Sequence, residues 1–193
     1  SGITAPNKTY DGNTNAPLDI SNISYSGLVS GDDIGGSFSG AFDNKNIGTS
    51  KTVTISSSYS GVDSGNYSVT DQSNTTANIT TRALIVSGLT ASNKTYDATT
   101  SAILDTSSVS YAGLVSGDSF SGSYTGTFNN ANVGTSKLVT ISSSHSGDDI
   151  NNYSITDQSS TGADITKASP TISGFSAQAK YSDENYTLAG VPS

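Results

Sequence analysis

Two Tyr-Asp pairs, Tyr10-Asp11 and Tyr96-Asp97, are residues whose types suit a binding site. A Tyr ring can stack on the face of a sugar while a neighbouring carboxylate accepts hydrogen bonds from the sugar hydroxyls. These four residues are therefore a candidate carbohydrate site. In the alternative, each Tyr packs into a core and each Asp caps the backbone of a turn. Because both pairs lie where an expected strand meets a turn, the sequence favours this alternative.

Acidic residues that recur in matched pairs form a second candidate site. Carboxylate and amide oxygens are the ligands that Ca²⁺ prefers in proteins. The candidate calcium ligands are Asp32, Asp63 and Asp71 with their counterparts Asp118, Asp149 and Asp157. None of them has the spacing of an EF-hand or a nonapeptide loop, and Asp is also a common turn residue. The sequence therefore predicts no obligatory cofactor and leaves Ca²⁺ as the ion that these residues would suit.

Side chains that act as general bases are nearly missing. The chain has a single histidine, His145, and a single glutamate, Glu184, and the position that matches His145 in the other copy is Tyr59. Nucleophilic catalysis needs a base within hydrogen-bond reach of Ser or Thr. We therefore predict that the chain is not an enzyme and that His145 lies on a surface loop.

Charge and composition argue against several partners. The 193 residues carry a formal net charge of -8, which repels phosphate backbones and anionic lipid head groups. We expect no nucleic-acid binding and, because no apolar run is long enough to span a bilayer, no membrane insertion. Cys and Met are both absent, which leaves little for oxidants to attack and favours an extracellular or cell-surface location.

Alternating apolar residues predict the β-strands that must position these candidates. Phe38 and Phe42, for example, share one face of a single run. Tyr67 and Tyr153 each alternate with a β-branched neighbour, so we expect both to be buried core anchors. Turns rich in Gly and Asp separate the runs, and no segment has a helical period. The predicted fold is all-β, with tandem small antiparallel β-sandwich or β-grasp-like modules in a rod-like array.

The chain repeats itself once. Residues 5–82 align without a gap on residues 91–168, and most aligned positions are identical. The segment between the copies, residues 79–86, favours strand and holds no Gly or Pro, which predicts a nearly fixed relation between neighbouring modules. The expected units are module 1 over residues 1–82, module 2 over residues 83–168, and the start of a third module or a free terminal strand over residues 169–193.

Several motifs occur in the same order in both copies. Each copy opens on Asn-Lys-Thr-Tyr-Asp, continues through Gly-Leu-Val-Ser-Gly-Asp, and ends on Asn-Tyr-Ser-Val/Ile-Thr before an Ala-x-Ile-Thr strand. This order resembles the YDG repeat family of large bacterial surface and secreted proteins, including filamentous-haemagglutinin-like adhesins. Module 2 departs from the signature at Ala98, so glycine is not required there. The segment that begins at Lys180 resembles the opening of a related MBG-type repeat. The resemblance implies a stalk or adhesin repeat and assigns the module no chemistry.

The two ends of the chain differ by one strand. Ser1 aligns with Ser87, so module 1 has no counterpart of the apolar run that begins at Ala83. The C-terminal tail does align with that run, which makes Thr171, Ile172 and Phe175 a candidate assembly strand. Either the ends reflect a fragment cut out of register with its modules, or the tail pairs with the open edge of module 1 in another copy. Pro170 weakens the second interpretation, because it lacks a backbone donor.

The leading functional hypothesis is a non-catalytic stalk or spacer repeat of an extracellular bacterial adhesin or surface filament, whose partners are neighbouring modules. One alternative is a filament subunit that binds copies of itself through its C-terminal tail. Another is a module that binds surface carbohydrate or calcium. Burial of Tyr10 and Tyr96 would favour a spacer, whereas exposure of the same Tyr-Asp cluster in both copies would favour binding.

Overall fold

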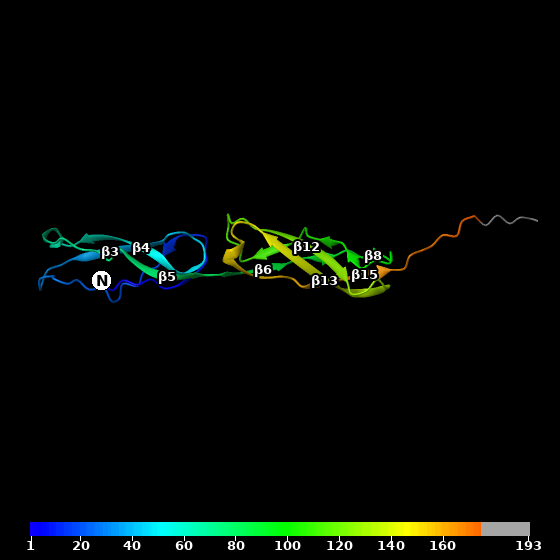
Figure 1. Cartoon of the computed structure of the whole chain (residues 1–193), viewed down its shortest axis with the longest axis horizontal. Helices are drawn as coiled ribbons and strands as arrows, with labels where there is room; N and C mark the ends of the chain where they lie inside the picture. The colour runs from blue at the N-terminus through cyan, green and yellow to red at the C-terminus, as the bar shows by residue number, and fades with distance from the viewer. Residues whose placement is uncertain (175–193) are drawn as a thin grey trace, which may run out of the picture.

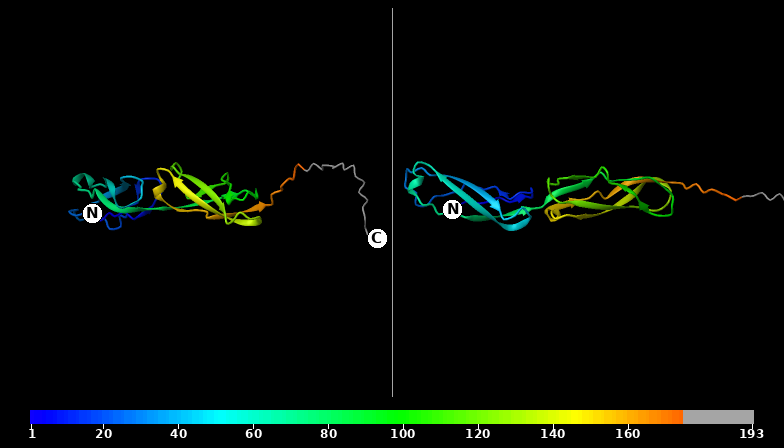
Figure 2. Two further views of the ribbon diagram at one scale, coloured as in Figure 1. Left: turned by 45° about the vertical axis from the view of Figure 1, so that its right-hand side comes forward. Right: turned by 90° about the horizontal axis from the view of Figure 1, so that it is seen from above.

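The computed structural model describes residues 1–174 and is built almost entirely of β-strands. Two modules lie end to end along the long axis of the molecule (Figures 1 and 2). Helical structure in the described residues is limited to two short 3-10 turns, η1 (Ser64–Asn66) and η2 (Ile150–Asn152). None of residues 1–174 belongs to a helix long and apolar enough to cross a membrane. The predicted all-β class is confirmed.

Module 1 is built on one five-stranded sheet with the strand order β1-β5-β4-β3-β2. Its strands are β1 (Lys8–Thr9), β2 (Asn15–Ala16), β3 (Gly35–Phe42), β4 (Gly48–Ser60) and β5 (Asn74–Thr80). Strands β3 and β4 form a long hairpin in which Phe42 pairs with Val53. Both of these side chains are buried, while Thr54 next to Val53 is exposed, as the alternation of strand side chains requires.

Module 2 repeats this sheet in the order β8-β15-β13-β12-β9 and adds a three-stranded sheet, β11-β6-β14, and a two-stranded sheet, β10-β7. Its strands are β6 (Arg82–Ser87), β7 (Thr90–Ala91), β8 (Lys94–Thr95), β9 (Ser101–Ala102), β10 (Leu104–Asp105), β11 (Ser110–Ala112), β12 (Ser121–Phe128), β13 (Gly134–Ser146), β14 (Tyr153–Thr156) and β15 (Ser160–Thr166). Val86 of β6 and Ile141 of β13 belong to one buried cluster, so the three-stranded sheet packs against the five-stranded one.

Three of the four sheets in residues 1–174 are mixed, whereas the sequence predicts antiparallel modules. Strand β1 pairs in parallel with β5, β8 with β15, and β6 with β14. Strands joined by a tight hairpin must be antiparallel, but a strand that pairs after a long crossover can run in either direction. Turn signals in the sequence predict only the hairpins. The long-range parallel pairs therefore cannot be predicted from these signals.

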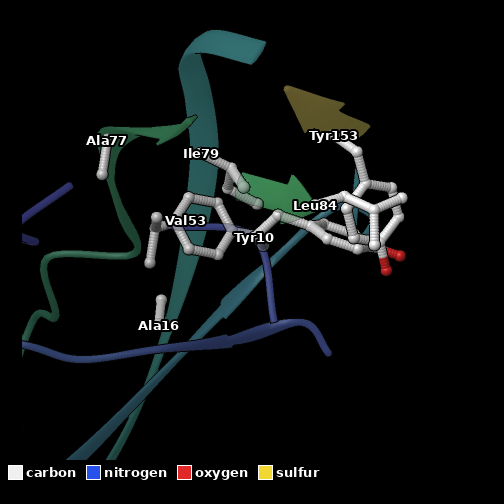
Figure 3. Close-up of a cluster of buried hydrophobic side chains, with 8 residues drawn as sticks. Tyr10, Ala16, Val53, Ala77, Ile79, Leu84 and Tyr153 are labelled. Atoms are coloured by element: carbon white, nitrogen blue, oxygen red, sulfur yellow. The ribbon is translucent and has the colours of Figure 1, made fainter. Parts of the chain in front are cut away.

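The apolar core of module 1 continues into module 2. One buried cluster joins Tyr10, Val53 and Ile79 of module 1 to Leu84 and Tyr153 of module 2 (Figure 3). A single residue lies between the end of β5 and the start of β6, so one extended segment crosses from module to module. The two modules therefore share apolar packing as well as a covalent link.

Candidate functional site at the junction of the modules

Tyr10 connects the end of module 1 to module 2. It follows β1, and its amide donates to the carbonyl of Thr80 at 2.9 Å, which fixes its backbone to the end of β5. Its side chain is fully buried, and its ring meets the ring of Tyr153 edge to face with the centroids 5.5 Å apart. Its hydroxyl donates to Oδ2 of Asp118 at 2.8 Å. Tyr10 therefore combines apolar burial with a directed hydrogen bond across the junction.

Asp118 is the acceptor at which the junction contacts converge. Its side chain is only 3% exposed, and besides Tyr10 it accepts hydrogen bonds from the Tyr153 hydroxyl at 2.5 Å and the Lys45 ammonium at 2.9 Å. Burial by itself would raise the pKa of Asp118, but the bonds from Tyr153, Lys45 and Tyr10 outweigh it and hold that pKa below its usual value. Asp118 is therefore an ionised and fully partnered carboxylate.

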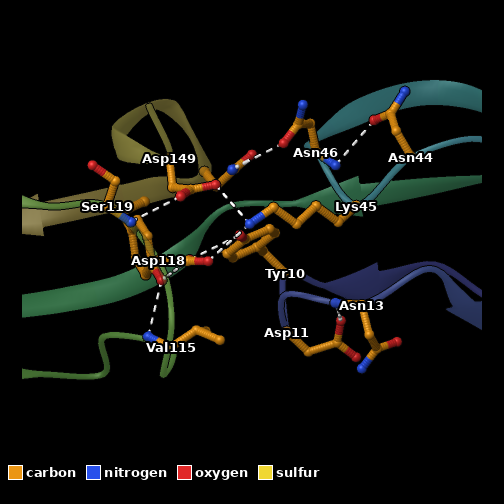
Figure 4. A network of polar contacts seen from close by, with 12 residues as sticks. Tyr10, Asp11, Asn13, Asn44, Lys45, Asn46, Val115, Asp118, Ser119 and Asp149 are labelled. Atoms are coloured by element: carbon orange, nitrogen blue, oxygen red, sulfur yellow. Dashed lines mark hydrogen bonds and ion pairs between the residues drawn. The ribbon is translucent and has the colours of Figure 1, made fainter. Parts of the chain in front are cut away.

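Lys45 extends from the loop between β3 and β4 into module 2 (Figure 4). Its ammonium lies 2.9 Å from Asp118 and 2.7 Å from Asp149, and 5.9 Å from the centroid of the Tyr10 ring. The bonds to Asp149 and Asp118 raise the pKa of Lys45, and the bond from Lys45 together with that from the Ser119 amide lowers the pKa of Asp149. One positive charge thus sits between two carboxylates that would otherwise repel each other.

Asn152 forms a second polar contact between the modules. It ends the η2 turn and is 3% exposed. Its Oδ1 accepts from the amide of Ile47 at 3.0 Å, and its Nδ2 donates to Oδ1 of Asn46 at 3.2 Å. Because a buried amide left without partners costs free energy, these bonds favour one docking position of the β3–β4 loop.

Gly12 allows the turn after Tyr10 to lie close to module 2. Its φ of +80° is in the left-handed region, and a Cβ built on it would lie 2.7 Å from Cγ1 of Val115. Ala98, at the matching place in module 2, also has a positive φ of 65° and is exposed. At the exposed position of Ala98 glycine is not required, as predicted, because alanine there adopts the strained left-handed backbone. Gly12 has an additional packing role, because it lies against Val115.

The candidate carbohydrate residues do not form the same surface in the two copies. Tyr10 is fully buried, so it cannot stack on a sugar in this structure, whereas Tyr96 is 42% exposed. Asp11 accepts from the amide of Asn13 and pairs with Lys8, and Asp97 accepts from the amide of Thr99. These are the turn-capping contacts of the alternative interpretation. The neighbouring module covers the ring of Tyr10 in this structure, and carbohydrate binding stays a prediction.

Of the three candidate assembly residues, Thr171 and Ile172 are exposed, and Phe175 lies outside the described residues. A role of these residues in assembly stays a prediction.

The six candidate calcium ligands are distributed over both modules. Asp118 and Asp149 lie together, but the cation between them is Lys45. The others have partners within their own module: Asp32 accepts from Tyr67, Asp63 from the amide of Asp33 and Asp71 from Tyr59, and Asp157 pairs with His145. In the part of the chain that the structure describes, no three acidic or histidine side chains gather into a metal site. Calcium binding stays a prediction.

Two sequence expectations about aromatic residues need correction. Tyr153 is buried, as predicted, but Tyr67 is only half-buried, because nothing in residues 1–174 covers it as Tyr10 covers Tyr153. His145 is not on a surface loop; it lies in β13, stacked on Phe120 with a side chain that is 9% exposed. The neighbours of His145 in sequence are serines, so no local apolar pattern indicates that its side chain faces the interior.

Lys45 and Asn152 are the junction residues that sequence reasoning missed. Lys45 is followed by Asn-Ile/Val-Gly-Thr-Ser-Lys, a motif that occurs in both copies, but the counterpart of Lys45 in module 2 is Ala131. A charged residue present in one copy and absent from the other, inside a conserved stretch of the repeat, is a usable signal for a contact made by only one of them. Asn152 gives no such signal, because both copies have Asn at this position.

The chain matches a known protein family. The model of a family described as the YDG domain matches residues 1–76 and 80–162. Neither the curated proteins nor the solved structures include a match to this chain.

Proposed function

Because this chain belongs to the YDG domain family, we propose that it is a non-catalytic stalk or spacer repeat of an extracellular bacterial adhesin or surface filament. The contacts at the junction between the modules are the main support for this proposal. A spacer must hold successive modules at a defined angle, and here the modules are joined by a continuous segment, a shared core and a polar network.

The polar network suits a role in orientation. A partly buried ion pair contributes little net stability, because desolvation of the charges offsets their attraction, but it penalises every arrangement in which a charge loses its partner. Tilting module 2 away from module 1 would separate Lys45 from Asp118 and Asp149 and would expose Tyr10 to water. The contacts therefore favour one relative orientation over a range of orientations.

The composition supports a location outside the cell. The chain has no Cys or Met, and its surface is rich in Ser, Thr, Asn and Gly with a net charge of -8. Such a surface offers oxidants few targets and resists association with other anionic molecules. This location is tested by asking whether an antibody to the module labels intact cells that produce the natural protein.

Small-angle X-ray scattering of lengthened chains tests the stalk role. Copies of residues 5–90, which contain Tyr10, Gly12 and Lys45, are inserted one at a time after residue 90. If the modules form a stalk, the maximum dimension grows linearly by roughly 35 to 45 Å per copy, as strands that rise about 3.3 Å per residue allow. Growth with the square root of the copy number, which is the behaviour of a flexible chain, would contradict the proposal.

The matched control for this experiment is the same series with Lys45→Ala and Tyr10→Ala in module 1 and in every inserted copy. The control series keeps the covalent link and the Asn152 contacts and loses the contacts of Tyr10 and Lys45 at every junction. We expect its maximum dimension to fall below that of the unchanged series at each length.

A further inference from the structure

A lysine ammonium fills the turn between β1 and β2 in module 1. The Lys8 side chain leaves β1 and is only 10% exposed. Its Nζ lies 2.8 Å from Oδ1 of Asp11 and 2.9 Å from the carbonyl oxygen of Asn15. The same Nζ lies 2.8 Å from the carbonyl oxygen of Asn13 and 3.2 Å from its Oδ1. One positive charge is thus surrounded by four oxygens from a single turn.

Module 2 repeats this arrangement with different side chains. The Nζ of Lys94 lies 2.7 Å from Oδ1 of Asp97 and 3.0 Å from the carbonyl oxygen of Ser101. It lies 2.9 Å from both the carbonyl oxygen and Oγ1 of Thr99, so a hydroxyl replaces the amide oxygen of the first turn. The four oxygens are kept although the side chain changes, which makes the arrangement a property of the turn. We call the two turns, residues 11–15 and 97–101, the oxygen cages.

Each oxygen cage offers more acceptors than the ammonium has hydrogens. A lysine ammonium has three N–H donors, whereas four oxygens lie within hydrogen-bond distance of each Nζ. Each N–H points toward one acceptor, but a metal ion attracts oxygens from every direction. The convergence of the oxygens therefore suits a spherical cation better than an ammonium.

The oxygens are of the kinds that Ca²⁺ prefers. Each oxygen cage has one carboxylate oxygen, two backbone carbonyl oxygens and one neutral side-chain oxygen. Ca²⁺ binds about six to eight such ligands in flexible geometry, and water supplies those that the protein lacks. The carboxylates of Asp11 and Asp97 are 40% and 53% exposed, so water can reach the same position. Asp11, Asn13 and Asn15 also have the spacing of the first three ligands of an EF-hand loop.

The charges favour a cation at both positions. Burial would raise the pKa of Asp11, but the bonds from Lys8 and Asn13 outweigh it and lower that pKa below its usual value. The bond from Lys94 lowers the pKa of Asp97 to about 2. Both carboxylates are therefore ionised. A divalent ion in place of the ammonium would add positive charge to a chain whose net charge is -8.

We propose that both oxygen cages are cation sites of the calcium type, in which the ammonium of Lys8 or Lys94 takes the place of the metal ion. The short tether keeps the ammonium at a high effective concentration, so free Ca²⁺ does not displace it in the unchanged protein. When the ammonium is removed, the same oxygens bind Ca²⁺ from solution. The cage of module 1 includes Gly12, which lies against Val115 of module 2. The internal cation thus also fixes a turn that belongs to the junction.

Calorimetric titration of the full 193-residue chain with CaCl₂ tests the proposal. Lys8→Met keeps an unbranched side chain beside the Phe42 ring and removes the charge. We expect one more Ca²⁺ site in this variant than in the unchanged protein, and two more in the double variant Lys8→Met, Lys94→Met. The expected dissociation constants are about 10⁻⁴ to 10⁻³ M, the range of extracellular calcium modules. At a tenfold excess over this constant, the unfolding midpoint of Lys8→Met should rise by about 3 °C or more.

Lys137→Met is the matched control, because among residues 1–174 its ammonium donates to a single oxygen, Oδ1 of Asn130 at 2.7 Å. It should gain no site. Asp11→Asn in the Lys8→Met background removes the carboxylate and should abolish the added site. A folded Lys8→Met variant without an added site, or an added site that survives Asp11→Asn, overturns the proposal. If Lys8→Met does not fold, Lys94→Met decides in the same way. The stalk role does not depend on this result, because it is tested by the length of joined modules.

Discussion

The hydroxyl of Tyr10 donates a hydrogen bond to Asp118, 108 residues further along the chain, at 2.8 Å. This bond joins the first turn of one module to the opposite module, and the packing around it makes Tyr10 part of a core that neither module completes alone. The junction can therefore be examined with substitutions that have a built-in control, since almost every junction residue has a counterpart outside the junction.

Tyr10→Ala should lower the free energy of unfolding by about 3 to 5 kcal/mol, as removal of a buried aromatic side chain does. Tyr96→Ala removes the same side chain from an exposed position and should cost about 0.5 kcal/mol or less. Urea unfolding of the two variants gives the comparison. Equal losses would show that Tyr10 is not held between the modules.

Lys45→Ala should leave Asp118 and Asp149 as two close carboxylates without a cation. The expected loss is about 1 to 2 kcal/mol, below the value for a fully buried pair because the Lys45 side chain is 36% exposed. Lys167→Ala removes the same charge from an exposed residue after β15 and should leave the unfolding midpoint unchanged. If the two variants behave alike, the Lys45 contacts contribute nothing.

Acid should weaken the junction. The pKa values of Asp118 and Asp149 are held below 3.8 in the folded protein, so their contribution is present above pH 3.8 and is lost as pH falls through the lower folded values. The difference in stability between the unchanged protein and Lys45→Ala should shrink over this range. A difference that is constant from pH 6 to pH 2 would contradict the assignment.

Alkali should act through the tyrosines. Burial and the bond to Asp118 raise the pKa of Tyr153 from 10 to about 12. Its contribution is therefore present below pH 10 and is lost as pH rises from 10 to about 12. Burial also raises the pKa of Tyr10 and Tyr124, so ultraviolet titration of tyrosinate absorbance should show a late component that is smaller, by one tyrosine, in Tyr153→Phe.

Gly12→Ala and Ala98→Gly should change stability in opposite directions. A methyl group on Gly12 would meet Val115 and strain a left-handed backbone, at a cost of about 1 to 3 kcal/mol. Ala98 already has that backbone and is exposed, so glycine there should stabilise the protein by up to about 1 kcal/mol. Thermal unfolding of both variants provides the measurement, and a gain from both would rule out the contact with Val115.

The sequence shows the local features of this protein well and its long-range contacts poorly. Alternation places the strands that contain Phe42 and Tyr153, and turn chemistry identifies Asp11 as a cap, because each depends on near neighbours. The bond from Lys45 to Asp118 spans 73 residues, and no local pattern specifies its partner. Comparison of the two copies provides long-range information that local patterns lack. Matched positions that differ between the copies, such as Lys45 and Ala131, indicate contacts that depend on the position of a module in the array.

The direction of the strands determines how the protein would respond to a pulling force. The chain enters module 2 through β6 at the junction and leaves after β15 at the far end, and the strands run along the long axis (Figure 1). Tension on the two ends would therefore slide β6 past β11 and β14, and β15 past β8 and β13. In this shear geometry the hydrogen bonds between two strands are loaded together, whereas peeling an edge strand breaks them one after another. We expect module 2 to resist extension until several inter-strand hydrogen bonds break at once.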